Sequence, residues 1–174
     1  MKISIPQSVS LGHESLRQAL VAATREPGQL GSTAQRVSRL LEPHMRREEA
    51  FALPPLGLLP ELARGEFTPE MAEVLPHTHW LQDNLDNMLA EHRMLRAALA
   101  EFLEAARAAR HVEYAAFAAE LIDHARLEEE VLYPAAILVG HYVRLRLKHR
   151  RREIFGAEGD VVGRVGIEPT TKGL

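Results

Sequence analysis

Four long segments of the sequence repeat apolar residues with the period of an α-helix, and this pattern limits the fold more than any other feature. Runs of alternating β-branched residues, which a sheet would need, are rare. The helical segments cover roughly residues 9–24, 32–56, 79–110 and 112–150. A Thr-Pro-Glu sequence at residues 68–70 predicts a short extra helix in the connection between the second and third segments. The pattern predicts an all-α protein, an antiparallel four-helix bundle.

Breaks in these segments add detail to the predicted bundle. Ser32 and Thr33 stand where the second helix would begin and are candidate N-caps. Pro43 lies inside the second segment, and Pro134 and Gly140 lie inside the fourth. Because proline removes a helical hydrogen bond and glycine weakens a helix, we expect a bend at Pro43 and another at Pro134 or Gly140.

The composition excludes several classes of function. The chain has 174 residues and no cysteine, which rules out disulfides, thiolate zinc sites, iron–sulfur ligation and cysteine nucleophiles. The net charge of −3 gives no reason to expect binding to nucleic acid or to a membrane. The N-terminus lacks the apolar core of a signal peptide, and the longest apolar run is too short to span a bilayer. We therefore expect a soluble, cytoplasmic protein.

Two histidine–glutamate pairs interrupt the apolar faces of the predicted helices. Successive residues turn by about 100° around a helix, so His124 and Glu128 lie on one side, one turn apart. Val131 falls in the same sector, whereas Glu129 and Glu130 fall outside it and are expected to be solvated. The companions of this pair on the apolar face are Leu121, Ala125, Leu132 and Ala135.

The second helix repeats this spacing with His44 and Glu48. They share a sector with Val37, Leu40, Leu41 and Phe51, while Arg46 and Glu49 are expected to point away into solvent. The first and third helices each add one histidine, His13 and His92, to an apolar face. A single inward histidine is more often a hydrogen-bonded core residue than a ligand. Six buried polar side chains together would destabilise a core unless one partner satisfied them all, so the set predicts a metal site.

The type and number of these side chains limit the metal. Four imidazoles and two carboxylates exceed the needs of one tetrahedral zinc ion. Two bridging carboxylates would leave two histidines for each of two ions, and an oxo or hydroxo bridge would leave one coordination position open on each. Such donors favour iron, with manganese and zinc as alternatives. An open position suits a small diatomic molecule or peroxide.

These segments resemble the hemerythrin-like family, also called HHE cation-binding, whose members are four-helix bundles with a non-haem di-iron centre. The matching motifs are "GHESLR", "HMRREEAFALPPL", "EHRML" and "HARLEEEVLYPAA", and the resemblance covers roughly residues 8–150. It implies that the iron ligands are His13, His44, Glu48, His92, His124 and Glu128, with the two glutamates as bridges. Ferritin-like di-iron proteins use Glu-x-x-His instead, a spacing that this sequence does not contain.

One position departs from the oxygen-carrying hemerythrins, which place a second histidine one turn after the ligand of the third helix. Here that position is Arg96, which cannot be a ligand, and this weakens the case for reversible oxygen storage. The set of four histidines and two glutamates is more similar to bacterial relatives linked to nitric oxide, oxidative stress and iron–sulfur cluster repair. The cysteine-containing N-terminal domain of the repair proteins has no counterpart here. Arg96 could steer an anion, but we expect its side chain to extend to solvent.

The sequence therefore predicts one domain over residues 1–153 and a disordered tail over 154–174. We expect a di-iron protein that binds O2, NO or peroxide in stress sensing or response. The alternative is a di-iron enzyme that turns over peroxide or NO, or that donates iron for cluster repair. A third possibility is a metal-free bundle with structural histidines. His77 and His79 could be extra ligands, but we expect surface-loop residues, and no protein partner can be named.

Overall fold

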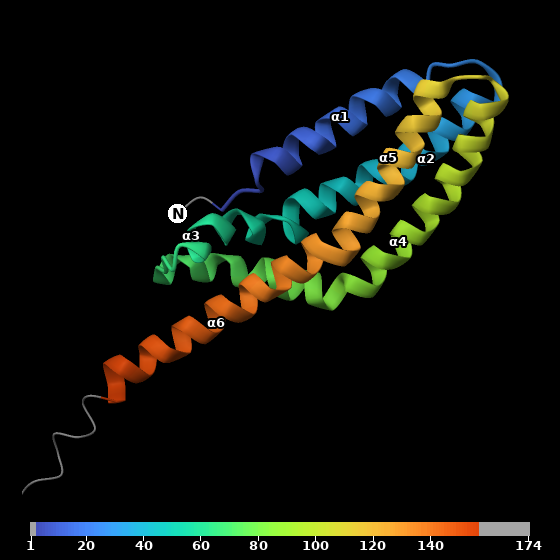
Figure 1. The fold of residues 1–174 in the computed structure, drawn as a ribbon. Coiled ribbons are helices and arrows are strands. Elements are labelled where there is room, and N and C mark those ends of the chain that lie inside the picture. Colours follow the sequence, from blue (N-terminus) through green and yellow to red (C-terminus); the bar gives the residue numbers. More distant parts are fainter. Residues whose placement is uncertain (1–2, 157–174) are drawn as a thin grey trace, which may run out of the picture.

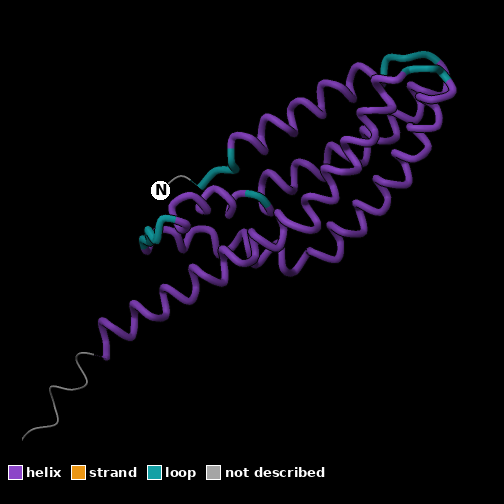
Figure 2. The backbone as a smooth tube through the Cα atoms, in the orientation of Figure 1, coloured by secondary structure: helices purple, strands orange, loops and turns teal. Residues whose placement is uncertain are grey.

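The structure is a computed structural model that describes residues 3–156. Within this range every secondary-structure element is a helix or helical turn, and there is no strand (Figures 1 and 2). This confirms the all-α prediction. The predicted disordered tail lies outside the described residues from position 157 onward, while residues 154–156 still belong to the last helix. The long helices are α1 (Gln7–Ala23), α2 (Gly28–Arg47), α4 (Leu75–Ala108), α5 (Val112–Leu127) and α6 (Tyr133–Gly156).

Short helical turns connect or interrupt the long helices. Two are π-helical, at Glu48–Ala52 directly after α2 and at Glu128–Leu132 between α5 and α6. A 3-10 turn at Pro54–Leu58 and the short helix α3 (Leu59–Ala63) follow the first π-helical turn. The predicted extra helix is a 3-10 turn at Pro69–Val74, with Thr68 at its N-cap position.

The helices α1, α2 and α4 and the α5–α6 segment run alternately in opposite directions (Figure 1). The α1–α2 and α4–α5 connections lie at one end of the molecule, and α3, in the connection between α2 and α4, lies toward the other. The helices α5 and α6 form one continuous rod whose C-terminal part projects beyond the other helices. The chain therefore presents four helical stretches side by side, namely α1, α2, α4 and the α5–α6 rod.

Two boundaries differ from the predictions. The second helix begins at Gly28, so Ser32 and Thr33 lie inside it, where both hydroxyls donate hydrogen bonds to the Gln29 carbonyl at 3.0 and 2.9 Å. Gly31 allows this early start, because a Cβ at that position would lie 1.9 Å from the Glu26 carbonyl oxygen. The third helix begins at Leu75, so His77 and His79 lie in its first turns rather than in a loop.

The irregularities of the helices do not lie at the predicted positions. Pro43 lies inside α2 without ending it. In the fourth segment the helix changes its winding at Glu128–Leu132, ahead of Pro134. Each π-helical turn closes with a hydrogen bond to the glutamate carbonyl from the residue five positions later, Leu53 or Tyr133. The irregularities therefore coincide with the two glutamates that the sequence assigns to a metal.

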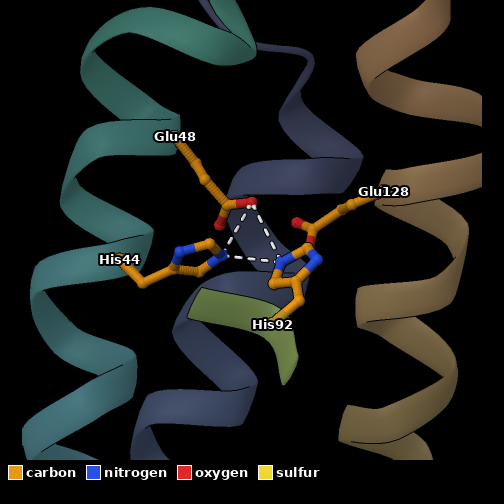
Figure 3. Close-up of side chains that lie close together, drawn as sticks. All are labelled: His44, Glu48, His92 and Glu128. Atoms are coloured by element: carbon orange, nitrogen blue, oxygen red, sulfur yellow. Dashed lines mark hydrogen bonds and ion pairs between the residues drawn. The ribbon is translucent and has the colours of Figure 1, made fainter. Parts of the chain in front are cut away.

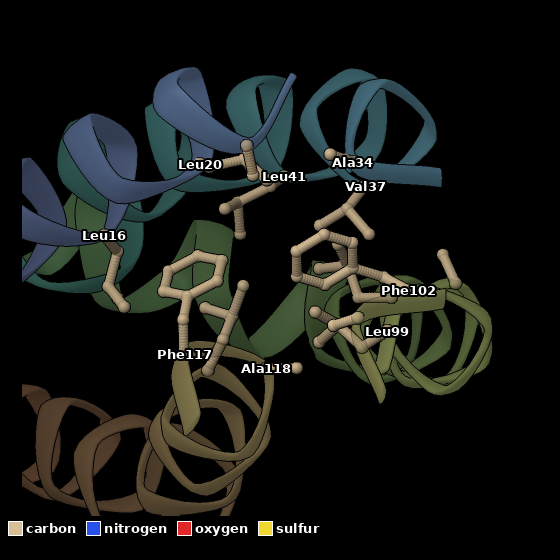
Figure 4. Packing of buried hydrophobic residues seen from close by; sticks show 14 of the residues in the cluster. Leu16, Leu20, Ala34, Val37, Leu41, Leu99, Phe102, Phe117 and Ala118 are labelled. Atoms are coloured by element: carbon tan, nitrogen blue, oxygen red, sulfur yellow. The ribbon is translucent and has the colours of Figure 1, made fainter. Parts of the chain in front are cut away.

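The core consists of apolar clusters on either side of the polar residues. The larger cluster fills the end near the α1–α2 and α4–α5 connections and is shown in Figure 4. Its members include Leu16, Leu20, Val37, Leu41, Leu99, Phe102, Phe117 and Ala118. A second cluster includes Ala52, Leu53, Leu56, Leu81, Met88, Tyr133 and Ala136. Each large side chain so buried contributes roughly 1.5–3 kcal/mol, so the helices are held firmly on both sides of the site.

Candidate metal centre

The structure brings all six predicted ligands together in the middle of the helices. Single histidines come from α1, α2, α4 and α5, and each glutamate is the first residue of a π-helical turn. The side chains of His13, His44 and His92 are at most 2% exposed, and both glutamates are equally buried. His124 is more accessible, with 18% of its side chain exposed. Buried polar groups such as these need hydrogen bonds, ion pairs or a metal to offset the loss of water.

The six side chains form two groups that share Glu128. In the first group, ligand atoms of His44, Glu48, His92 and Glu128 all lie within 4.8 Å of one another (Figure 3). The second group consists of His13, His124 and Glu128 and meets the same limit. The imidazole rings are paired accordingly, with ring centroids 4.5 Å apart for His44 and His92 and 5.1 Å apart for His13 and His124. Each group could hold a metal ion.

The two carboxylates lie between the histidine pairs. Glu48 places Oε1 3.4 Å from Nε2 of His44 and Oε2 3.9 Å from Nε2 of His13. Glu128 places Oε1 3.0 Å from Nε2 of His124 and Oε2 3.5 Å from Nε2 of His92. Each glutamate thus directs one oxygen toward each histidine pair.

The π-helical turns change which residues face this site. A π-helical turn contains more residues than an α-helical one, so it rotates the following side chains relative to an α-helical wheel. Phe51 and Val131, which were predicted to face inward, are 39% and 50% exposed. Glu49 and Glu129, which were predicted to be solvated, reach the site histidines instead. The first prediction was wrong because it assumed a regular α-helix, and the second because Glu49 and Glu129 bind imidazoles of other helices.

Three of the four histidines have a second carboxylate partner on their other ring nitrogen. Each Nδ1 donates a hydrogen bond to a glutamate of another element, which directs the Nε2 lone pair toward the cluster. The pairs are His13 with Glu49 at 2.9 Å, His44 with Glu91 at 2.7 Å and His92 with Glu129 at 2.9 Å. Sequence reasoning missed all three glutamates as partners of the site. The repeated Glu-Glu at 48–49 and 128–129 was an available signal for two of them.

An arginine holds each of these outer carboxylates. Arg96 donates to Glu129 at 2.7 Å, so the prediction that its side chain only extends to solvent was wrong. The other two pairs are Arg17 with Glu49 at 2.9 Å and Arg47 with Glu91 at 2.6 Å. Because each arginine fixes a carboxylate that fixes an imidazole, three ligands are positioned before any metal binds.

His124 is held differently. Its Nε2 lies 3.0 Å from Oε1 of Glu128, but the two groups are not aligned for a hydrogen bond. In the described part of the chain, Glu128 is the only carboxylate within 4.0 Å of this imidazole. His124 is therefore the least constrained and most exposed of the four histidines.

When metal is absent, the surroundings favour the protonated form of His13 and His44 and the ionised form of Glu128. Burial alone would lower the pKa of His13, but hydrogen bonds and charges from Glu128, Glu48 and Glu49 raise it. Glu48 and Glu91 raise the pKa of His44 against burial in the same way. Burial alone would raise the pKa of Glu128, but its close contacts with the imidazoles of His124, His13 and His92 hold it well below its ordinary value. A metal bound here would displace these protons.

Tyr133 is a further buried group at the site that sequence reasoning missed. Its hydroxyl donates a short hydrogen bond to Oε1 of Glu48, and its ring stacks against His92 with centroids 5.7 Å apart. Burial, followed by the charges of Glu48 and Glu128, raises the pKa of the phenol, so it stays protonated. Tyr133 lies five residues after Glu128, and only the π-helical turn places both side chains on the same face.

A small cavity adjoins the ligands on the side of the larger apolar cluster. Its volume is about 10 Å³, which is close to the space that one water molecule needs. The polar lining consists of His44, Glu48, His92, His124 and Glu128. The apolar lining consists of Leu41, Met45, Leu95, Leu99, Leu121 and Ala125. The remaining space at the donor atoms therefore admits only an ion or a molecule of a few atoms.

The two histidines at the start of α4 are not near the cluster. His79 precedes His92 by 13 residues on the same helix, which corresponds to roughly 20 Å at 1.5 Å per residue. Its Nε2 accepts a hydrogen bond from Arg144 at 2.7 Å. His77 is placed still earlier on α4, so neither residue adds to the ligand set.

Comparisons of the chain with protein-family models, with curated proteins and with solved structures give no match. Among the described helices, none combines the length and apolarity that a membrane crossing requires. The assignment of a function therefore depends on the geometry and chemistry of the site.

Proposed function

We propose that this chain is a hemerythrin-like protein, an antiparallel four-helix bundle with a non-haem di-iron centre that binds a small diatomic molecule or oxidant such as O2, NO or peroxide. The observation that carries the proposal is the orientation of Glu48 and Glu128. Each presents one carboxylate oxygen to the His44–His92 pair and the other to the His13–His124 pair or to one of its members. Carboxylates that span two histidine pairs are the arrangement that two bridged ions require.

The donor set supports iron as the metal. Mixed imidazole and carboxylate donors suit iron and manganese, with zinc as an alternative, and the sequence has no cysteine to favour a softer or purely structural site. His44, His92, Glu48 and Glu128 would hold one ion, and His13, His124 and Glu128 would hold the other. When bound, an iron pair supplies reversible redox chemistry and affinity for O2, NO or peroxide.

The surroundings of the metal-binding side chains favour a small bound molecule. The cavity of about 10 Å³ is walled on one side by leucines, methionine and alanine, which disfavour charged or large molecules. On the other side, Tyr133 keeps a hydroxyl proton beside Glu48 and so retains a hydrogen-bond donor at the site. A role in stress sensing or response would use occupancy of this site as its output.

The alternative function is enzymatic, either turnover of peroxide or NO or donation of iron for iron–sulfur cluster repair. The observation that favours iron donation is the 18% exposure of the His124 side chain, against at most 2% for the other three histidines. Steady removal of peroxide or NO by the loaded protein would separate turnover from binding alone.

The first test is the metal content per chain after anaerobic reconstitution with ferrous iron, followed by absorption spectra in air. We expect two irons per chain and near-ultraviolet bands that change on addition of NO or peroxide. The Glu48→Ala, Glu128→Ala double variant should lose the second iron and these bands. A Glu48→Gln, Glu128→Gln variant preserves the side-chain shape if the alanines impair folding.

Glu130→Ala is the matched control, because Glu130 adjoins Glu129 but is exposed. It should retain two irons and the wild-type spectrum. A folded wild-type protein that takes up no iron, or only one iron per chain, would overturn the di-iron proposal. The buried histidines would then be core residues stabilised by their glutamates.

A further inference from the structure

The metal site is built from two copies of the same pattern. His-x-x-x-Arg occurs on α1 and again on α4, and His-x-x-x-Glu-Glu begins in α2 and again in α5. The two histidines of the first motif are 79 residues apart, and those of the second are 80 residues apart. The matching residues are His13, Arg17, His44, Glu48 and Glu49 in one copy and His92, Arg96, His124, Glu128 and Glu129 in the other.

The contacts follow this correspondence. In the first copy, the His13 imidazole and the Arg17 guanidinium both bind Glu49, each at 2.9 Å. In the second copy, His92 and Arg96 bind Glu129 at 2.9 and 2.7 Å. The two helix pairs therefore hold His13 and His92 in the same way.

The correspondence breaks at one place. His44 donates to Glu91, the residue just before His92, and Glu91 is held by Arg47, three residues after His44. The equivalent positions around His124 are residue 12, just before His13, and residue 127, three residues after His124. These positions hold Gly12 and Leu127, which offer neither a carboxylate nor a guanidinium.

The exposure of the site reflects this difference. Leu127 is 48% exposed, and a Cβ built on Gly12 would point into open space. His124 is 18% exposed, against at most 2% for the other three histidines. The histidine that lacks the outer pair is thus also the most exposed of the four.

We infer that the two metal positions are unequal. The position built on His13 and His124 exchanges its ion readily, whereas the position built on His44 and His92 retains its ion. An outer carboxylate that orients a ligating imidazole changes metal affinity by roughly 10–100-fold. The His44–His92 position has such a carboxylate on both histidines, whereas the His13–His124 position has one on His13 alone. This inference rests on the proposed di-iron function and adds that one divalent cation is exchangeable.

The test is the rate of iron release from the anaerobic, two-iron protein to an excess of a coloured ferrous chelator. We expect two phases of one iron per chain each, with rates that differ by roughly 10–100-fold. The Gly12→Glu, Leu127→Arg variant supplies the residue types found at 91 and 47, and should slow the fast phase only. Glu91→Gln removes the charge of the outer partner of His44 and should accelerate the slow phase only.

A Gly12→Gln, Leu127→Gln variant controls for the effect of new side chains on α1 and α5 without new charges, and it should release iron as the wild type does. Release of both irons in one phase would overturn the inference while leaving the di-iron proposal intact. The inference would also be overturned, with the di-iron proposal intact, if Gly12→Glu, Leu127→Arg slowed the slow phase or if Glu91→Gln accelerated the fast phase. Uptake of fewer than two irons would overturn both.

Discussion

Replacement of Glu129 by glutamine tests whether the outer carboxylates control the metal site. The carboxylate accepts hydrogen bonds from Nδ1 of His92 at 2.9 Å and from Arg96 at 2.7 Å. Glutamine has nearly the same shape and can still accept a hydrogen bond, but it carries no charge. The ring of His92 would remain in place while its Nε2 becomes a weaker donor to a metal.

The expected loss follows from the burial of this contact. His92 is buried, so solvent cannot replace the lost charge at its Nδ1, and the affinity for metal should fall by roughly 10–100-fold, or about 1.4–2.7 kcal/mol. The loss of the Arg96 ion pair adds little, because Arg96 is partly exposed and its charge can be solvated. The helical fold should be unchanged, since neither residue packs in the apolar clusters.

The assay is anaerobic competition for ferrous iron between the protein and a chelator of known affinity. Glu130→Gln is the control, since it makes the same change of charge one residue further along at an exposed position. It should bind iron as the wild type does. If Glu129→Gln also binds iron with wild-type affinity, or if Glu130→Gln weakens binding equally, then orientation of His92 by Glu129 is not important for the site.

Three further outcomes concern stability. Tyr133→Phe should lower the unfolding free energy of the metal-free protein by about 1.5–3 kcal/mol in urea titrations, because the hydroxyl donates to the charged Glu48; an unchanged midpoint would contradict this. Gly140→Ala should lower the melting temperature, since the new Cβ would lie 2.3 Å from Oγ1 of Thr78, whereas Gly12→Ala, with open space around it, should not. The metal-free protein should lose stability as the pH rises above about 6.5. The pKa values of His13 and His44 are raised in the folded protein, so their protonation stabilises the fold fully only below their pKa in the unfolded chain. Urea titrations at pH 6 and pH 8 measure this loss, and greater stability at pH 8 would contradict it.

The sequence by itself determined the helical class and the six candidate ligands. Both follow from local spacing: His44 and Glu48, like His124 and Glu128, are separated by one helical turn, and that separation places them on one face whatever the rest of the chain does. A polar pair on an apolar face is visible without knowledge of the neighbouring helices. In the structure these side chains form two groups that share Glu128 and that could each hold a metal ion.

The tertiary structure decided how these ligands are held. Glu91 and Glu129 act on imidazoles of other helices, and no local spacing connects residues that lie 47 or 37 positions apart. The π-helical turn at Glu128–Leu132 rotates Tyr133 toward the site, whereas a regular helical wheel places it elsewhere. The proposed inequality of the two metal positions also depends on contacts between helices. Glu91 of α4 binds His44, and Gly12 of α1 takes the equivalent position beside His124. This correspondence is visible only once the helices are packed together.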